Sequence, residues 1–145
     1  MDRRVSLTFD AAEPRTLGQF WIVALGYVEE APPPPHTSWP EALEAWGVPP
    51  EQREDFYAIV DPDGIGPRVF FQRVPEPKTA KNRLHLDVAV PGWDGTGERP
   101  GHDAVLAHAE RLREAGATRV RVVDEPVEGY WVVMEDPEGN VFCVI

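Results

Sequence analysis

The chain has 145 residues, a formal net charge of −11 and a single cysteine. Its length favours one domain with a core of its own, and the negative charge argues against a general affinity for nucleic acid, whose phosphates it would repel. One cysteine excludes an internal disulfide and a zinc cluster built from cysteines, and no run of about 18 apolar residues is present to span a membrane. We therefore expect a cytoplasmic protein.

The first half of the chain predicts a strand, a helix and three further strands. Apolar and polar residues alternate over 5–9, as in a half-buried strand, and an apolar stripe at helical spacing follows over 14–26. A short strand should begin at Tyr27. Residues 32–53 are rich in proline and predict an irregular segment, with a short helix at WPEALEAWG. Two strands around the turn DPDG at 61–64 then predict a hairpin.

The second half predicts the same order of elements. NRLHLDVAV, residues 82–90, predicts a strand, and a glycine-rich loop and a helix ending at Gly116 follow it. TRVRVVDEP predicts the next strand, and YWVVMEDPEGNVFCVI predicts a second hairpin around the turn at 136–139. We expect the acids of both turns to be solvated, and His108 to face solvent from its helix.

Together the two halves predict an α+β fold made of two βαβββ units, about 3–75 and about 82–145, within a single domain spanning 1–145. One such unit would leave one face of its sheet open. Two units can pair their sheets into a curved, half-closed barrel with the helices outside. The inner face would then form a cup, and concave sites of this kind bind small ligands.

Two βαβββ units, the second opened by NRLHLDVAV and closed by MEDPEGNVFCVI, resemble the vicinal oxygen chelate superfamily. Within it, the stretch FDAAEPRTLGQFWIVALGY is typical of the glyoxalase-like proteins of the glyoxalase/bleomycin-resistance/dioxygenase group. The superfamily includes isomerases, ring-cleaving dioxygenases, epimerases, fosfomycin-modifying enzymes and drug-sequestering binders. The resemblance therefore implies the fold, and the function must be argued from the site.

The resemblance also implies where a metal would be bound. Catalytic members hold one divalent metal in the cup, with His or Glu ligands on the first and last strands of each unit. The matching positions here are Ser6, Gln72, His85 and Cys143, and Cys143 stands where many relatives have an acidic ligand. Divalent metals need three or more good protein ligands. We therefore expect no divalent metal, and His85 as its ligand if one binds; no other cofactor is identified.

The same inward positions are candidates for binding a small molecule. His85 could act as a general acid or base, and Gln72 could orient a carbonyl or hydroxyl group. Trp39 and Trp46 could cover the cup and stack on a flat ligand, or they could simply hold the proline-rich segment against the body of the protein. Cys143 could be a soft ligand or a small packed residue.

The leading hypothesis is a glyoxalase-like protein that binds or transforms a small organic molecule in its cup, with a degenerate metal site. One alternative is a metal-dependent lyase or dioxygenase that uses His85 as a ligand. Another is a non-catalytic interaction module. Whether the chain is an enzyme stays open on the sequence. The resemblance implies a homodimer, and we expect neither nucleic acid nor a membrane as a partner.

Overall fold

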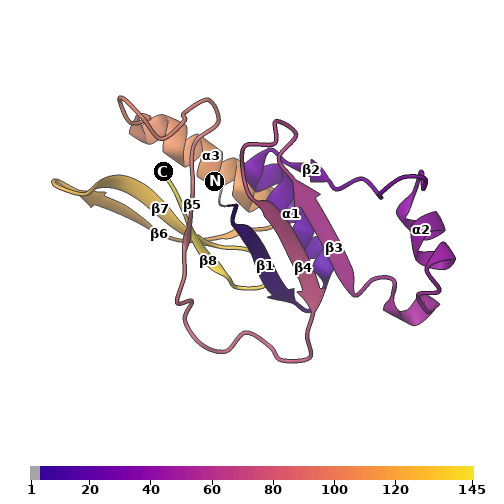
Figure 1. Ribbon diagram of the computed structural model, residues 1–145. Helices are drawn as coiled ribbons and strands as arrows, with labels where there is room; N and C mark the ends of the chain where they lie inside the picture. The colour runs from indigo at the N-terminus through magenta and orange to yellow at the C-terminus, as the bar shows by residue number, and fades with distance from the viewer. Residues whose placement is uncertain (1–3) are drawn as a thin grey trace. The chain divides into compact units, whose positions relative to one another are not determined.

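The structure is a computed structural model that describes residues 4–145 (Figure 1). The chain divides into two compact units, Met1–Pro77 and Lys78–Ile145, each with one helix-covered sheet of four strands. Among the described residues, no helix is long and apolar enough to cross a membrane. These units match the two predicted repeats, whereas the prediction of a single domain stays a prediction.

Unit 1 forms a mixed sheet in which the strand order is β1-β4-β3-β2. The first and last strands of the unit, β1 and β4, lie parallel and adjacent, and the other neighbours are antiparallel. Its elements are β1 (Ser6–Ala11), α1 (Pro14–Leu25), β2 (Val28–Glu29), α2 (Trp39–Ala45), the 3₁₀ helix η1 (Pro50–Gln52), β3 (Phe56–Val60) and β4 (Arg68–Arg73).

Helix α1 covers one face of this sheet because its apolar side chains recur at helical spacing. Leu17 and Trp21 are buried there at 0 and 1% exposure, one turn apart, and the helix packs on β1, β3 and β4. Pro14 occupies the first turn, where no N–H is needed, and Gly26 ends the helix with a left-handed φ of 69°. The predicted helix is confirmed.

Unit 2 repeats the architecture with the strand order β5-β8-β7-β6, and β5 and β8 are again parallel. Helix α3 packs on β6, β7 and β8. The elements are β5 (Leu86–Val88), α3 (His102–Glu114), β6 (Thr118–Glu125), β7 (Gly129–Glu135) and β8 (Val141–Val144). Both units are therefore βαβββ, and the predicted α+β fold is confirmed.

Strand β5 is shorter than the sequence predicts. Alternation suggested a strand over 82–90, but only Leu86–Val88 is extended and paired, and Leu84 is 68% exposed. The side chain of Asn82 accepts the N–H of Val141 at 3.2 Å, at the first residue of β8. The Asn82 side chain thus binds the backbone N–H at the start of β8, and backbone pairing between β5 and β8 begins only at Leu86.

Two further expectations were wrong. Asp136 is only 3% exposed, and its carboxylate accepts the backbone N–H groups of Glu138 and Asn140, each at 2.9 Å. The acid of the second turn therefore holds the hairpin together instead of being solvated. His108 is 6% exposed and lies on the buried side of α3, not in solvent.

Candidate functional site

Unit 1 contains a pocket of about 380 Å³ whose lining residues come mainly from α2, β3, β4 and the segment between α2 and β3. This volume falls in the range of small-molecule sites. Five aromatic side chains line it: Trp39, Trp46, Phe56, Tyr57 and Phe70. Six charged side chains complete its wall: Arg15, Glu29, Glu30, Arg53, Glu54 and Arg68. Every lining residue belongs to unit 1.

The outer wall is α2, a helix fixed by its caps and by one tryptophan. The Ser38 hydroxyl accepts the N–H of Glu41, and Glu41 in turn accepts the N–H and hydroxyl of Thr37 at 3.0 and 2.9 Å. These hydrogen bonds hold the pKa of Glu41 below its ordinary value. The Trp39 indole N–H donates to the carbonyl of Glu30 at 2.6 Å, which ties the helix to the chain after β2.

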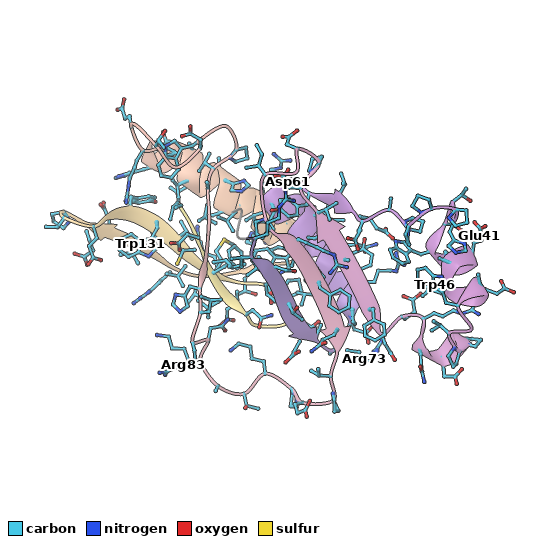
Figure 2. The ribbon with its side chains drawn as sticks, viewed as in Figure 1. Glu41, Trp46, Asp61, Arg73, Arg83 and Trp131 are labelled. Carbon is cyan, nitrogen blue, oxygen red and sulfur yellow. The ribbon has the colours of Figure 1, made fainter. Side chains whose placement is uncertain are left out.

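Trp46 presents an open ring to the pocket. Its ring meets that of Trp39 edge to face, with centroids 6.2 Å apart, and it is 51% exposed (Figure 2). His36 packs edge-on against the same indole at 5.6 Å. Trp46 is thereby held in place by two neighbouring rings while half of its surface stays open to solvent. A side chain of this kind suits stacking on a flat ligand.

The inner wall comes from the open face of the sheet, on the side away from α1. Ala58 lies opposite Phe70 in the β3–β4 ladder, so side chains two residues apart on either strand share one face. Phe56 and Phe70 stack on this face with ring centroids 5.8 Å apart and 19° between the planes. Phe56 remains 55% exposed. The sheet therefore offers the pocket a second aromatic surface.

Tyr57 reaches the pocket from the opposite face of β3, through a gap that a glycine leaves. A Cβ on Gly18 of α1 would overlap the Tyr57 ring and lie 3.3 Å from the Phe71 ring. The phenol donates to Glu29 Oε2 at 3.1 Å. Burial, and then this hydrogen bond and the charge of Glu29, raise the pKa of Tyr57 to about 12. The phenol is therefore neutral near pH 7 and is held in one orientation.

Two of the lining arginines are paired with carboxylates. Arg68 binds Glu30 through two hydrogen bonds of 2.7 Å, and its guanidinium lies 5.1 Å from the centre of the Phe70 ring. Arg15 Nη1 lies 3.7 Å from Glu29 Oε2, and Arg15 Nε lies 3.3 Å from Glu54 Oε2. The guanidinium carbon of Arg15 is 5.0 Å from the centre of the Tyr57 ring. These pairs fix the polar rim around the aromatic walls.

The two predicted metal positions of unit 1 are not neighbours. Ser6 lies opposite Arg68 in the β1–β4 ladder and donates its hydroxyl to the Arg68 carbonyl at 3.2 Å. Gln72 lies opposite Asp10, and its amide donates to Asp10 Oδ1 at 2.7 Å. Gln72 therefore stands four residues after Arg68, the partner of Ser6, on strand β4. Asp10, which the sequence analysis did not single out, is the side chain beside Gln72.

In unit 2, the residue opposite Cys143 is Asp87 and not His85. His85 is exposed and precedes the first paired residue of β5. Burial, followed by the nearby charge of Asp87, raises the pKa of the Cys143 thiol, so the neutral thiol is favoured. Within residues 4–145, no group of three or more His, Cys, Asp and Glu side chains is arranged to hold a metal ion.

The structure places both predicted aromatic residues, Trp39 and Trp46, in the wall of one pocket. Phe56 and Arg53 were not among the site residues predicted from the sequence. The signal for Phe56 was present in the predicted hairpin. Ala58 lies opposite Phe70, and Phe56 stands two residues before Ala58 on the same face of the strand. Arg53 carried no comparable signal, since its place in the wall depends on how the segment around η1 folds.

Comparison with known proteins identifies a family match over nearly the whole chain. The family model described as a glyoxalase-like domain matches residues 6–145. No curated protein sequence is similar enough to the chain to be matched with it.

Solved structures show the same fold at low sequence identity. A mutant of the genomically encoded fosfomycin resistance protein FosX from Listeria monocytogenes, solved with Mn(II) and 1S,2S-dihydroxypropylphosphonic acid, aligns with a TM-score of 0.63. It is 10% identical, over 99% of this chain and 91% of its own. The bleomycin-binding protein of Streptomyces verticillus, solved with copper(II)-bleomycin, aligns with a TM-score of 0.52 and 16% identity, over 99% and 95%. A glyoxalase/bleomycin resistance protein/dioxygenase family enzyme from Burkholderia phytofirmans aligns with a TM-score of 0.58. It is 16% identical, over 97% of this chain and 94% of its own.

Proposed function

Because the chain belongs to the glyoxalase-like domain family, we propose that it binds a small, flat organic molecule in the pocket of unit 1 and does so without a divalent metal. The observation that carries this proposal is that two half-exposed aromatic side chains from different elements line one pocket. Trp46 follows the last residue of α2 and Phe56 begins β3, and each leaves about half of its surface open.

These walls favour a planar ligand for a simple energetic reason. Burying apolar surface contributes about 25 cal/mol per Å², and a well-oriented aromatic pair adds about 0.5–1.5 kcal/mol. The walls are already fixed by the Trp39–Glu30 hydrogen bond and by the Phe56–Phe70 stack. Little side-chain order would then be lost on binding, so more of the contact energy would appear as affinity.

The side chains at the four predicted metal positions do not suit a divalent metal. Ser6 and Gln72 offer a hydroxyl and a carboxamide, and each already donates a hydrogen bond within unit 1. Cys143 is a thiol whose pKa is raised, whereas metal binding requires the thiolate. His85 is the one ordinary ligand of the set. These donors do not make an ordinary divalent metal centre, and none of the four residues lines the pocket of unit 1.

The lining of the pocket also favours binding over catalysis. It includes neither histidine nor cysteine within the described chain, and the pKa of its tyrosine is raised to about 12. Its three carboxylates are held by arginines. The wall therefore lacks the histidine that most often serves as a general acid or base, and its carboxylates are engaged in ion pairs. Two structural neighbours carry the names of small molecules, bleomycin and fosfomycin, which is consistent with a ligand-binding role for this fold.

A titration of planar aromatic compounds against the protein tests this function. We expect calorimetry at pH 7.5 to show one binding site in the wild type, with affinity unchanged by added EDTA. Trp46→Ala should weaken binding by about tenfold or more, because truncating a stacked tryptophan is costly. Trp93→Ala, which removes a tryptophan from a loop of unit 2, is the matched control. Equal affinities in both variants, or binding that EDTA abolishes, would contradict the proposal.

A further inference from the structure

The charged groups of the pocket do not balance in pairs. Three arginines and three glutamates line it. Arg68 holds Glu30, and Arg15 holds both Glu29 and Glu54. Two guanidinium groups therefore occupy all three carboxylates. The third arginine, Arg53, is left without a carboxylate partner among residues 4–145.

Arg53 is held in place by a single hydrogen bond. Its Nε donates to the carbonyl of Val48 at 3.0 Å, and the side chain is part-buried in the pocket wall. A guanidinium has five N–H donors, and the two terminal nitrogens carry four of them. Their position is constrained by the bond at Nε, but their donors have no acceptor in the described chain. A pre-positioned fork of this kind matches a carboxylate or phosphate.

We propose that Arg53 is the recognition site for an acidic group, and that the ligand is a planar aromatic molecule that carries a carboxylate. This proposal rests on the proposed function of the pocket. The aromatic walls would take the ring system, and the two terminal nitrogens of Arg53 would donate to the two carboxylate oxygens. An aryl carboxylate suits this arrangement, because its acidic group extends from the edge of the ring and leaves both ring faces free to stack.

A cationic aromatic ligand is the main alternative, since aromatic walls also attract cations. The structure favours the anion for a local reason. The rings of Phe70 and Tyr57 already have guanidinium groups beside them, from Arg68 and Arg15, at 5.1 and 5.0 Å. A further cation there would meet like charges. The net charge of −11 acts over longer distances, and at 0.15 M salt such fields are screened beyond about 8 Å.

Three probes with one ring system and three charges test this inference. We would measure the Kd values of 2-naphthoate, 2-naphthylmethanol and 2-naphthylmethylammonium in 0.15 M salt at pH 7.5. The proteins would be the wild type, Arg53→Gln, Arg53→Lys and Arg83→Gln. Arg83 is an exposed residue of unit 2 that does not line the pocket, so its variant makes the same change in net charge without altering the pocket wall (Figure 2).

We expect the wild type to bind 2-naphthoate about tenfold or more tighter than the alcohol, because hydrogen bonds to a charged group are the stronger kind. Arg53→Gln should remove this preference while leaving the alcohol's Kd within about twofold. Arg53→Lys should restore part of the preference, and Arg83→Gln should keep all of it.

Several results would overturn the acidic-group site. These are equal affinity of the wild type for naphthoate and alcohol, a preference for the ammonium compound, or the same loss in Arg53→Gln and Arg83→Gln. Loss of alcohol binding in Arg53→Gln would show that the residue only shapes the pocket. If the alcohol binds without any preference for the acid, the pocket's proposed function survives. If none of the three probes binds the wild type, both proposals fail.

Discussion

The two units share one strand order but differ in the connection between their second and third strands. In unit 2 only residues 126–128 join β6 to β7, and these strands form a long hairpin. In unit 1 residues 30–55 intervene, β2 is reduced to Val28–Glu29, and α2 and η1 fill the gap. Half of the residues that line the pocket belong to this inserted segment, and the others come from α1, β2, β3 and β4. The repeat thus supplies the scaffold and part of the wall, and the insertion completes the site.

The two helices bury residues at the same spacing. Four buried positions of α1, at 14, 17, 18 and 21, repeat the spacing of 105, 108, 109 and 112 on α3, and α1 buries Phe20 and Ala24 as well. Aligned on these four positions, Leu17 corresponds to His108 and Gly18 corresponds to Ala109. Unit 1 has a glycine where the Tyr57 ring needs room, and unit 2 has a histidine where unit 1 has a leucine.

The open faces of the two sheets differ as well. Ile59 and Met134 each stand two residues before the aspartate of their turn. Val69 lies opposite Ile59, and Phe142 lies opposite Met134. The next residue along is Phe70 in unit 1 and Cys143 in unit 2. Phe70 forms part of the aromatic wall, whereas Cys143 is a small buried thiol. The same position of the repeat therefore serves a ligand pocket in one unit only.

The largest effect should come from giving unit 1 the residue of unit 2 at position 18. Gly18→Ala places a Cβ 2.2 Å from Cδ1 of the Tyr57 ring, which packs on the Phe71 ring and donates a hydrogen bond to Glu29. Overpacking costs about 1–3 kcal/mol, and the better helix propensity of alanine returns about 1 kcal/mol. We expect a net loss of up to about 2 kcal/mol in urea unfolding, and weaker ligand binding because the displaced ring enters the pocket.

Gly101→Ala is the control for this change. Gly101 precedes α3 with a φ of −66°, and nothing lies within 4 Å of the Cβ that it would gain. This variant should stay within about 1 kcal/mol of the wild type and bind ligand normally. A Gly18→Ala protein as stable as Gly101→Ala would show that the close packing of α1 on Tyr57 does not matter.

A smaller effect should follow from giving unit 2 the residue of unit 1 at position 108. His108 is buried and its Nε2 has no hydrogen-bond partner in the described chain. His108→Leu should raise the free energy of unfolding by about 1 kcal/mol near pH 7.5, because an unpaired buried polar group is removed. Chemical denaturation of both proteins would measure this gain.

The same variant should change the dependence of stability on pH. Burial, and then the charge of Arg111, lower the pKa of His108 below its ordinary 6.5 in the folded state. The unfolded chain therefore takes up the proton more readily. The contribution of neutral His108 to the free energy of unfolding should be complete above pH 6.5. It should fall as the pH drops from 6.5 through the lowered pKa of the folded state. His108→Leu should lose this part of the decline, and His102→Gln, on the same helix, should keep it.

The smallest effect should come from Cys143. Cys143→Val keeps a small apolar side chain in the sheet, so we expect a change in unfolding free energy below about 1 kcal/mol. In the wild type the raised pKa and burial of the thiol should make its alkylation much slower than in the denatured chain. Protection of this thiol by added Zn²⁺ would instead identify it as a metal ligand.

Much of the fold was predictable because its signals are local. Two DPxG turns, alternation in the strands and the Pro14–Gly26 helix signature each depend on a few neighbouring residues. His108 could also have been placed correctly, since it lies in one stripe with Val105, Ala109 and Leu112. The shorter β5 could not, because it depends on Asn82 reaching Val141, 59 residues away.

The candidate site was predictable only in part. Trp39 and Trp46 stood out as tryptophans in a proline-rich segment, and both line the pocket. The roles of Tyr57 and Arg53 depend on Gly18 of another element and on how η1 folds, which no local pattern reports. The four metal positions came from resemblance alone, and the strand register separates Ser6 from Gln72.

We infer that the insertion of unit 1 completes the ligand site, and the five tryptophans of the chain allow a direct test. Each indole N–H gives one signal in a ¹⁵N-labelled protein, assigned through single Trp→Phe variants. On titration with 2-naphthoate, we predict that the signals of Trp39 and Trp46 shift in proportion to occupancy while those of Trp93 and Trp131 stay in place. Shifts at Trp93 or Trp131, with Trp39 and Trp46 unchanged, would contradict the account.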